Sequence, residues 1–588
     1  MEKSSNDIFK TQVLGHPAGL FVLFFTEMWE RFSYYGMRAL LILFLVAKVS
    51  DGGWGWERSE AYALFGWYVM LVYFLPLLGG WVADNKWGHV KTVIVGAAII
   101  TLGHASMAIA DLQIGFDLKF MFYVGLLLIV LGTGLFKPNM SSTVGKMYST
   151  QSKKKDGAYT IFYMGVNSGA FIGTLLVGWI GETFSWSFGF GLAGIFMLFG
   201  LLQFYFARSI FGKEASMPKS KLVTDASSGK EIKVPFTSTD NVLTVIGGIL
   251  AVTWIVEGIT SVVTRGYHFL PQTFAGYDIS VGFVMFLVSI VIFAYLGLSR
   301  LKRFEAVERD RLKVIFIIAF FVIFFWASFE QAGTTMNIFA RDYTNRTLTD
   351  SWALIYKVID FILSVAPMLV LTWVIFKLAT VIIKKFPLTI LFTSISFLII
   401  WALVIFRVYD KVTGDTALVD TSWFQILNPI FIISLAPLYS KFWEKYKFSG
   451  PQKFFGGFTL LALGFGMLVL GASSIPPGAQ TASVSMIWLI LAFLFHTMGE
   501  LSIAPVGLSY VSKLAPARML GFIFGIWYLF IGLSGKLASI MAEYSDSIAS
   551  EVGFSGFFLI FTIIPFIAGL AMLALNNPLK RLMHGIDK

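Results

Sequence analysis

The sequence predicts an all-α membrane protein that crosses the bilayer many times. Hydrophobic residues make up 57% of its 588 residues and charged residues only 13%, and the mean hydropathy is +0.76. A water-soluble protein of this size needs far more charge on its surface. The apolar residues also form runs of about 20, long enough for a helix to cross the hydrocarbon core. Together these two observations predict a polytopic helical fold.

Each apolar run is predicted to be one membrane-spanning helix. The sixteen predicted spans cover residues 18–47, 60–83, 91–110, 119–138, 157–180, 187–208, 241–263, 281–299, 312–340, 353–378, 386–407, 422–442, 452–474, 485–510, 518–541 and 555–577.

The loops between the spans predict the orientation of the chain. With the N-terminus in the cytoplasm, basic loops fall on the cytoplasmic side and acidic loops, such as 543–551, on the other side. The basic loop residues include Lys86, Lys91, Lys146, Arg300, Lys302, Arg303, Lys384, Lys385, Lys441, Lys445, Lys580 and Arg581. Both termini are therefore predicted to be cytoplasmic. The same distribution explains the net charge of +11 without a nucleic-acid partner, because the basic residues orient the chain in the lipid bilayer.

Two pairs of spans look like insertions, and without them twelve spans remain as six plus six. That is the arrangement of a major facilitator with two six-helix bundles. Both pairs are expected to lie at the periphery, to line no part of a central cavity and to carry few buried charges, with Glu257 as the main exception. The predicted units are the N-terminal bundle (1–211), a cytoplasmic linker (212–240), the first inserted hairpin (241–300), the first helix of the C-terminal bundle (301–350), the second inserted hairpin (351–410) and the remaining five helices (411–588).

The first span carries charge at bilayer depth. Glu27, Glu30, Arg31, Tyr34 and Arg38 follow helical spacing and lie along one stripe. Charge at this depth is costly, so the stripe is expected to face a partner or a water-filled cavity. An ion cluster that only holds helices together is the structural alternative, but membrane folds seldom need four charges for packing. The stripe therefore predicts a functional site.

Further polar residues lie in other spans. Lys137 ends the fourth span, Asn167 lies in the fifth, Glu330 in the seventh core span, and Asn428 and Glu500 in later spans. Lys137 and Glu500 are interpreted as functional because each is a charge at bilayer depth. The two asparagines fit an ordinary interhelical hydrogen bond equally well.

Several of these residues lie within longer motifs. The motifs are acid-x-x-acid-Arg followed by Phe-x-Tyr-Tyr-Gly at 27–36, Gly-x-Gly-x-x-Lys-Pro-Asn at 132–139, and Phe-Tyr-x-x-Val-Asn-x-Gly at 162–169. They resemble the proton-dependent oligopeptide transporter (POT) family of the major facilitators, and the resemblance covers all twelve core spans. The short loop 475–484 resembles the bacterial type, since the animal branch carries a large extracellular domain there. The second inserted hairpin and the linker length depart from typical members.

The charges suit a dipeptide, which at neutral pH is a zwitterion. Basic residues of the N-terminal half suit its carboxylate and Glu500 suits its ammonium group. A two-residue extended backbone spans about 7 Å, short enough to bridge two halves. Aromatic residues supply walls that tolerate varied side chains. The predicted peptide-binding residues are Arg31, Tyr34, Tyr35, Arg38, Tyr73, Lys137, Asn167, Trp326, Asn428, Glu500 and Trp527.

The resemblance implies a proton-coupled symporter that imports di- and tripeptides by alternating access. It implies a multi-pass protein of the inner (cytoplasmic) membrane with protons as the coupling ion and no cofactor, metal or catalytic residue. Burial and arginine partners act in opposite directions on a carboxylate, so titration near physiological pH is possible. The resemblance implies a gate formed by Arg38 and Glu330, and a proton-coupling set of Glu27, Glu30, Arg31, Lys137 and Glu330.

Other functions were weighed against this one. The alternative in the same class is a facilitator for another small charged solute, either a drug or an anion. A drug exporter would not need three basic groups, and an anion carrier would not need Glu500. A membrane enzyme needs a catalytic histidine or paired acids near a membrane face, whereas these charges lie in mid-span. The sequence therefore favours a transporter and predicts no enzymatic activity.

Overall fold

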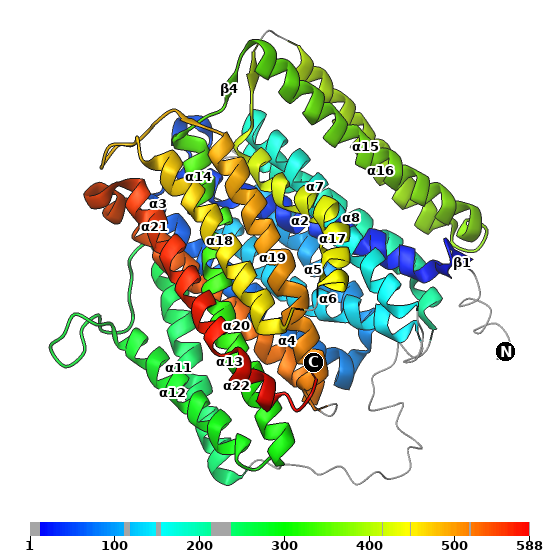
Figure 1. The fold of residues 1–588 in the computed structure, drawn as a ribbon. Coiled ribbons are helices and arrows are strands. Elements are labelled where there is room, and N and C mark those ends of the chain that lie inside the picture. Colours follow the sequence, from blue (N-terminus) through cyan, green and yellow to red (C-terminus); the bar gives the residue numbers. More distant parts are fainter. Residues whose placement is uncertain are drawn as a thin grey trace, which may run out of the picture.

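The computed structural model describes residues 12–110, 118–148, 154–212, 237–413, 416–446, 448–516 and 519–586. This part of the chain is almost entirely helical (Figure 1). Its strands are two residues long and form three short ladders: β1 (Gln12–Val13) with β2 (His16–Pro17), β3 (Thr344–Asn345) with β6 (Val484–Ser485), and β4 (Thr347–Leu348) with β5 (Ala417–Leu418). Residues 213–236, most of the predicted linker, lie outside the described residues.

The helices up to residue 342 follow the apolar runs. The first group is α2 (Ala18–Val46), η1 (Val49–Asp51), α3 (Arg58–Phe74), α4 (Pro76–Val82), the π-helical turn η2 (Ala83–Trp87), α5 (His89–Ile109), α6 (Phe120–Lys146), α7 (Lys155–Thr183), α8 (Trp186–Ala207) and η3 (Arg208–Phe211). The next group is α11 (Ser238–Val263), α12 (Val281–Leu301), α13 (Ala306–Phe329), η4 (Glu330–Gly333) and α14 (Thr335–Asp342).

The rest of the chain continues in the same way. Its helices are α15 (Asp350–Ile382), α16 (Pro387–Val412), η5 (Thr421–Ile426), α17 (Leu427–Lys445), α18 (Gly450–Ala472), α19 (Ile487–Leu514), α20 (Leu520–Glu543), α21 (Ser545–Ala574) and α22 (Asn576–Leu582).

Fifteen of the described helices are long and apolar enough to cross a membrane. The charged helix α2 is not among them, but its 29 residues also suffice to span the hydrocarbon core. The all-α polytopic fold predicted from the sequence is confirmed. Helix α2 is buried along nearly its whole length, because it packs against α7 and α8 in the centre of the bundle.

Glycines of α7 set the position of the charged stripe on α2. A Cβ added at Gly169 would clash with the Met28 carbonyl, and one added at Gly173 would clash with the Phe32 carbonyl. The two backbones can therefore approach only because these positions lack a side chain. This close approach fixes the depth and rotation of Glu30 and Arg31, which lie between those contact points.

The span predicted at 312–340 is an interrupted helix. Helix α13 ends at Phe329, the 3₁₀ turn η4 follows, and α14 restarts at Thr335. Gln331 stabilises the break, because its side chain donates to the Ala538 carbonyl of α20 at 2.9 Å and accepts from the Thr335 hydroxyl at 2.7 Å. Irregular backbone at membrane depth needs such internal partners. The break places Glu330 at the point where the helix axis is interrupted.

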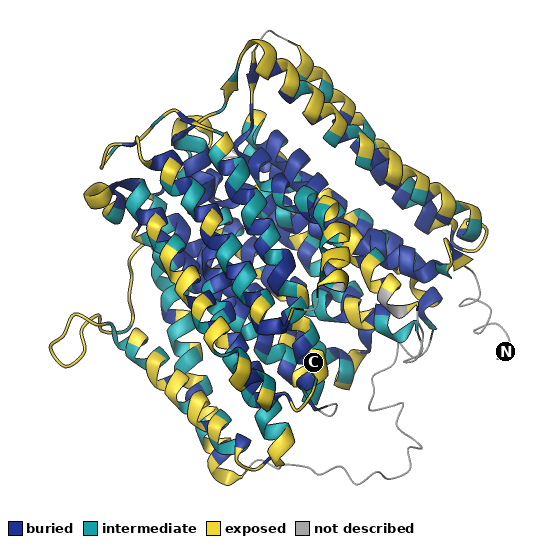
Figure 2. Cartoon of the chain, in the orientation of Figure 1, coloured by how far each residue is buried: buried dark blue, intermediate teal, exposed yellow. Residues whose placement is uncertain are grey.

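The two inserted hairpins lie along opposite edges of the bundle (Figures 1 and 2). In the most apolar 18-residue stretch of each helix, only 11% of the residues of α11 and 17% of those of α12 are buried, against 72% for α7. The values for α15 and α16 are 28% and 39%. Exposed residues cover much of both hairpins in Figure 2, and many of them are large and apolar, as expected for helices that face lipid on several sides.

Candidate functional site

The charged stripe of α2 forms a compact ion cluster inside the bundle. Arg31 Nε lies 3.1 Å from Glu27 Oε1 and 2.5 Å from Glu30 Oε2. All three side chains are at least 95% buried. Two carboxylates share one guanidinium here, so the cluster has an excess of negative charge that another cation or a proton can balance.

Lys137 of α6 approaches this cluster. It interacts electrostatically with Glu27, Glu30 and Arg31. Its Nζ lies 4.4 Å from the centroid of the Tyr73 ring, a cation–π distance. Helix α6 can come close because a Cβ at Gly134 would meet Leu75, at the junction of α3 and α4. The sequence motif Gly-x-Gly-x-x-Lys thus places a partly buried cation beside the two acids.

The predicted gate residues form an ion pair. Arg38 of α2 donates to Glu330 at the start of η4. The Arg38 guanidinium also lies over the Phe65 ring of α3, 5.3 Å from its centroid. A Cβ at Gly333 would lie 3.0 Å from Arg38 Nη2, so the glycine makes room for the arginine. The pair therefore joins α2 to the break in the α13–α14 helix.

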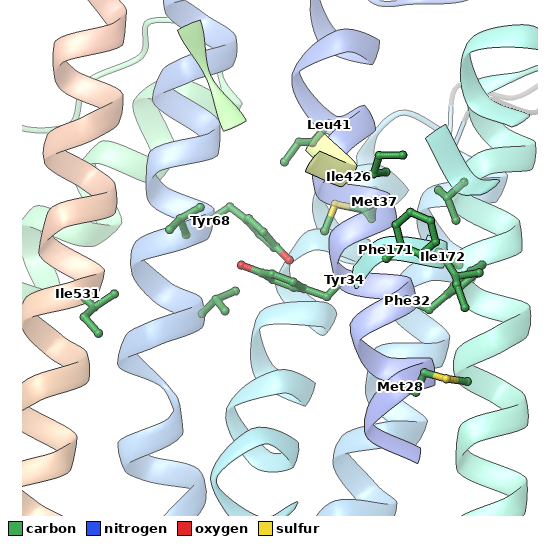
Figure 3. Close-up of a cluster of buried hydrophobic side chains, with 14 of the residues drawn as sticks. Met28, Phe32, Tyr34, Met37, Leu41, Tyr68, Phe171, Ile172, Ile426 and Ile531 are labelled. Atoms are coloured by element: carbon green, nitrogen blue, oxygen red, sulfur yellow. The ribbon is translucent and has the colours of Figure 1, made fainter. Parts of the chain in front are cut away.

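Three of the predicted tyrosines surround these charges. Tyr34 stacks on Tyr68 with ring centroids 6.2 Å apart and planes 25° apart, and Figure 3 shows the two rings between α2 and α3. Tyr35 packs edge-on against Tyr34 at 5.1 Å and interacts electrostatically with both Glu330 and Glu500. Tyr73, the third, lies under Lys137. Together they form a polar aromatic wall next to the cluster.

Glu500 of α19 interacts electrostatically with Tyr35 of this wall. The Asn428 amide donates to Glu500 Oε2 at 2.8 Å and to Thr497 Oγ1 at 3.1 Å. Glu500 also interacts electrostatically with Glu330. A neutral amide holds the carboxylate, and among the described residues no cation pairs with it, so its negative charge can bind a cationic group.

The structure brings the other three predicted peptide-binding residues less clearly to this site. The Asn167 amide donates to the Tyr163 carbonyl at 2.9 Å, one turn back on its own helix. Trp326 packs against its neighbour Phe329 with centroids 5.2 Å apart. Trp527 is buried where a Cβ at Gly507 would contact its ring. Their part in ligand binding stays a prediction.

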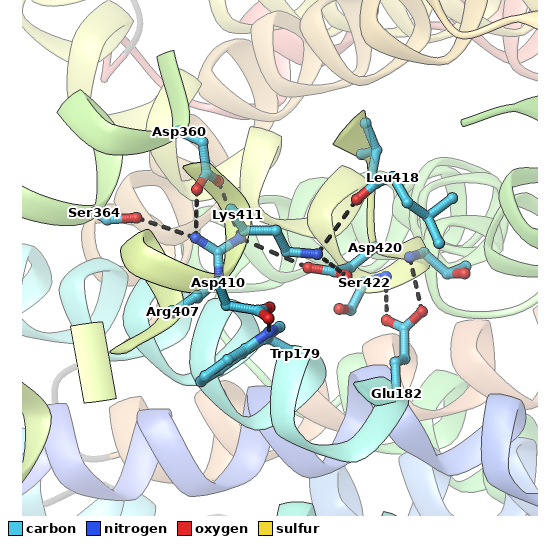
Figure 4. Close-up of polar contacts among 12 residues, drawn as sticks. Trp179, Glu182, Asp360, Ser364, Arg407, Asp410, Lys411, Leu418, Asp420 and Ser422 are labelled. Carbon is cyan, nitrogen blue, oxygen red and sulfur yellow. Dashed lines mark hydrogen bonds and ion pairs between the residues drawn. The ribbon is translucent and has the colours of Figure 1, made fainter. Parts of the chain in front are cut away.

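A second charged network was missed, and it corrects the expectation that the inserted pairs carry few buried charges apart from Glu257. Arg407 of α16 is fully buried and pairs with Asp360 of α15 at 2.5 and 3.0 Å (Figure 4). Asp420 lies 3.6 Å from the same guanidinium. Both charges of the pair lie inside predicted spans, so the rule applied to α2 would have identified them.

A third group of charges joins distant elements at the end of the bundle that carries the 47–57 loop. Arg58, at the start of α3, lies 2.8 Å from Asp342 and 2.8 Å from Asp546. It also donates to the Tyr343 hydroxyl at 3.3 Å. A polar cavity of about 340 Å³ lies beside it, lined in part by Glu543. Charges at helix ends are common, so the sequence did not single these out.

Within the described residues, no group of three or more histidine or acidic side chains is arranged to hold a metal ion. The arrangement instead brings a basic and acidic cluster on α2 and α6 and an acid on α19 within electrostatic range of Glu330 and Tyr35. Such an arrangement suits the binding of a small solute with charges of both signs.

Comparisons with known proteins agree with the motifs. The family profile described as "POT family" matches residues 90–412 and 387–558, and the two matches overlap within α16 of the second inserted hairpin. The "Peptide transporter YePEPT" of Yersinia enterocolitica subsp. palearctica serotype O:3 (strain YE-P4) is 33% identical over 553 residues, which cover 92% of this chain and 91% of that protein.

Two further proteins are similar over almost the whole chain. The "Di-/tripeptide transporter" of Lactococcus lactis subsp. cremoris is 30% identical over 585 residues and covers 97% of both chains. A crystal structure of a mutant peptide transporter POT in complex with alafosfalin has 27% identity and a TM-score of 0.71, covering 99% of both chains. The chain therefore belongs to the POT family, and it is a transporter rather than an enzyme.

Proposed function

We propose that the protein is a proton-coupled symporter that imports di- and tripeptides by alternating access. The observation that carries this proposal is the set of charges of both signs around Glu330. Arg38 pairs with Glu330, and Lys137 and Glu500 each interact with it electrostatically. A zwitterion with a terminal carboxylate and a terminal ammonium group matches cations and an acid that lie this close together. The names of the similar peptide transporters support the same substrate class.

In this proposal the ends of the peptide, rather than its side chains, are gripped. The basic residues bind the carboxylate, and Glu500 binds the ammonium group with Asn428 holding the acid in place. Asn167 and Asn428 exchange hydrogen bonds with the amide or the amine. The aromatic residues form adaptable walls for the variable side chains. These aromatic residues are Tyr34, Tyr35, Tyr73, Trp326 and Trp527.

Proton coupling is assigned to the buried carboxylates that share cations. Glu27 and Glu30 compete for Arg31, with Lys137 close by. A proton on either acid leaves Arg31 with one carboxylate partner instead of two, so the guanidinium can bind the peptide carboxylate more readily. Glu330 is the fifth member of the coupling set, because its ion pair holds Arg38. Protons are the coupling ion, and no other cofactor is needed.

The Arg38–Glu330 pair is proposed as the gate. It joins α2, in the N-terminal bundle (1–211), to η4, in the first helix of the C-terminal bundle (301–350). Formation of the pair therefore draws the two bundles together. We assign the C-terminal bundle to 301–350 and 411–588, with inserted hairpins at 241–300 and 351–410 and a linker at 212–240. Both hairpins are proposed to line no part of the peptide cavity.

The protein is proposed to lie in the inner (cytoplasmic) membrane with both termini in the cytoplasm. The basic loops support this orientation, because they alternate along the chain with acidic or uncharged loops, as expected where basic loops face the cytoplasm. The 47–57 loop, the start of α3 and the end of α7 then lie on the outer side. That side is called the outer end below.

Uptake of labelled dialanine into proteoliposomes tests the proposal. With an inward proton gradient, dialanine is expected to accumulate above its external concentration, and without the gradient it is expected only to equilibrate. The alternative is a facilitator for a drug or an anion. It would be supported if dialanine neither accumulates nor competes while a cationic drug or nitrate is moved by the same protein.

A further inference from the structure

The second inserted hairpin, α15–α16, leaves and rejoins the core at a single point. Strand β4 precedes α15 and strand β5 follows α16, and the two pair antiparallel with Thr347 opposite Leu418 and Leu348 opposite Ala417. Opposing residues of such a ladder lie only about 5 Å apart. The hairpin is therefore an insertion whose two ends meet. It can be removed without changing where the flanking strands lie, so its contacts with the core can be tested separately.

One contact of the hairpin is with the N-terminal bundle, near the cytoplasmic end of α8. The Thr393 hydroxyl donates to Gln203 Oε1 at 2.7 Å, and the Thr389 hydroxyl donates to the Gln203 carbonyl at 3.1 Å. The Phe397 ring packs edge-on against Trp29 of α2, with centroids 5.4 Å apart. This part of α16 is thus anchored to α8 and α2.

At the outer end the hairpin again touches the N-terminal bundle, through α7. The indole N–H of Trp179 donates to Asp410 Oδ2 at 3.3 Å, and the Trp179 ring packs against Phe406. An apolar cavity of about 500 Å³ lies beside this contact, lined by residues of α5, α7, α8 and α16. The Phe184 ring also stacks on Phe406, with centroids 5.9 Å apart. The hairpin therefore does not pack continuously along the core in this region, and Trp179 and Phe184 form a local bridge to it.

The same end of the hairpin is bound to the C-terminal bundle through charge. Arg407 pairs with Asp360 and lies 3.6 Å from Asp420, which precedes η5. Lys411 lies 2.7 Å from Asp420 (Figure 4). The Tyr356 ring packs against Trp423 of η5, with centroids 5.6 Å apart. The hairpin thus holds the segment that leads into α17.

The Trp179 contact and the Asp420 contacts of the hairpin lie next to a junction between the two bundles. Glu182, at the end of α7, accepts hydrogen bonds from the backbone N–H groups of Thr421 and Ser422, both at 2.8 Å. A Cβ at Gly178 of α7 would clash with the Ser422 side chain. Helix α7 and η5 are therefore packed closely at the outer end, where hairpin residues contact Trp179 of α7 and Asp420 before η5 (Figure 4).

We propose that the α15–α16 hairpin is an outer clamp that holds α7 and η5 together and so favours the outward-closed state. The inference rests on alternating access in the proposed function. Outward opening must separate α7 from η5. Separating the hairpin from η5 would take both Arg407 and Lys411 away from Asp420, which costs more than breaking one hydrogen bond at a helix end. At the outer end the hairpin therefore moves with η5, and the contacts that break there on opening are Trp179–Asp410 and the ring contacts with Phe406.

The clamp is tested by measuring the outer opening directly. The chain contains no cysteine, so spin labels can be attached only where cysteines are introduced. Ser50 and Ser547 are exposed at the outer end, one in each bundle. The distance between labels on Ser50→Cys and Ser547→Cys is measured by double electron–electron resonance in the full-length protein, without peptide or proton gradient. The long-distance population reports the outward-open state.

A matched pair of tryptophan variants isolates the bridge. Trp179→Phe removes the hydrogen bond to Asp410 and keeps an aromatic ring. We expect it to raise the ratio of long to short distances about threefold or more. Trp401→Phe is the control, because its indole donates to Thr372 inside the hairpin at 3.0 Å. It is expected to leave the ratio at the parental value.

Excision of the hairpin gives a second test. Replacement of residues 350–415 by a short Gly-Ser linker joins the β4–β5 ladder, and we expect at least a tenfold rise of the same ratio, since every contact of the clamp is lost. An unchanged ratio in the excised protein or in Trp179→Phe would overturn the proposal, as would an equal rise in Trp401→Phe. If the excised protein does not fold, the tryptophan pair decides. Because no peptide is needed, failure of dialanine uptake would count against the proposed function and not against the clamp.

Discussion

Arg38 and Glu330 form an ion pair at the point where one transmembrane helix is interrupted. The pair joins α2, which carries the proposed proton-coupling acids, to a segment that interacts electrostatically with Glu500. Breaking a buried pair on one side leaves an uncompensated charge, so the two partners constrain each other strongly. A proton or a peptide carboxylate that releases one partner therefore changes what holds α2 and η4 together.

The first prediction concerns proton coupling. Glu27→Gln and Glu30→Gln each remove one acid from the cluster around Arg31 and keep the shape of the side chain. We expect either variant to abolish dialanine accumulation driven by a proton gradient and to spare exchange of dialanine at equal concentrations. Uptake and counterflow into proteoliposomes measure the two activities. If both variants still concentrate dialanine under the gradient, the coupling assignment is wrong.

The second prediction concerns the ammonium site. Glu500→Ala removes the acid that Asn428 holds, so a bound ammonium group would lose its charged partner. Loss of one side of such a pair costs about 3–5 kcal/mol, which is at least about a hundredfold in affinity. Competition binding with free-amine and N-acetylated dipeptides measures the loss.

Acetylated dipeptides lack the charged amine, so their weaker binding should fall much less in Glu500→Ala. The control is Glu551→Ala, which removes an exposed acid near the outer end of α21 and should change neither affinity. Equal losses for free and acetylated dipeptides in Glu500→Ala would show that this residue does not bind the amine.

Much of the fold follows from local features of the sequence. Runs of about 20 apolar residues predicted the spans, and the charge stripe predicted a functional site on α2, whose charges keep it out of the set of most apolar helices. The break at Glu330 did not follow, because it depends on Gln331 reaching the Ala538 carbonyl, more than 200 residues away. Interactions of that kind have no local pattern.

Among the charged networks, too, some pairs could be predicted from the sequence and others could not. Arg407 and Asp360 lie inside apolar runs, and the principle used for α2 predicts that they pair. They were missed because the hairpin was treated as a peripheral insertion. Arg58 is different, since an arginine at the end of a span is expected from the loop composition alone. Its two acidic partners come from segments that only the tertiary fold brings together.

The third prediction concerns Arg58. Arg58→Met removes ion pairs to Asp342 and Asp546, which join α3 to the C-terminal bundle at the outer end. Ser539, buried on α20 where it packs against Gly66, serves as the reporter. We expect Arg58→Met to raise the rate at which an impermeant maleimide modifies Ser539→Cys several-fold, since partly exposed pairs contribute about 1 kcal/mol.

A second arginine at the same end provides the control. Arg265 pairs with Glu60 at 2.9 Å and joins the first hairpin to α3 without reaching the C-terminal bundle. Arg265→Met should leave the modification rate of Ser539→Cys unchanged. A rate that rises equally in both variants would mean that loss of surface charge, rather than opening between α3 and α20, controls access.

The fourth prediction concerns stability. Arg407→Met leaves Asp360 buried without its partner and should lower the free energy of unfolding by about 3–5 kcal/mol. Asp360→Asn combined with Arg407→Met removes both charges and should recover most of that loss. Equilibrium unfolding in detergent with increasing denaturant compares the two proteins. A double variant as unstable as the single one would mean that packing of the Arg407 side chain, and not the unpaired acid, dominates.

The last prediction concerns Glu257 in the first inserted hairpin. Its carboxylate is buried but has local partners: the His268 ring at 2.9 Å, the Phe269 N–H at 3.2 Å and the Gln272 amide at 3.3 Å. These bonds hold the loop that connects α11 to α12, at the outer end and at the edge of the bundle (Figure 1).

Glu257→Gln keeps one carbonyl acceptor but turns an amide N–H₂ towards donors, so the loop should loosen and become more sensitive to protease. Proton-driven dialanine uptake should stay within about twofold of the parent, because loss of one or two partly exposed hydrogen bonds costs little and the coupling acids lie elsewhere. Glu27→Gln, measured in parallel, provides the loss-of-coupling reference. A Glu257→Gln protein that folds normally yet loses gradient-driven uptake would place this hairpin in the transport mechanism.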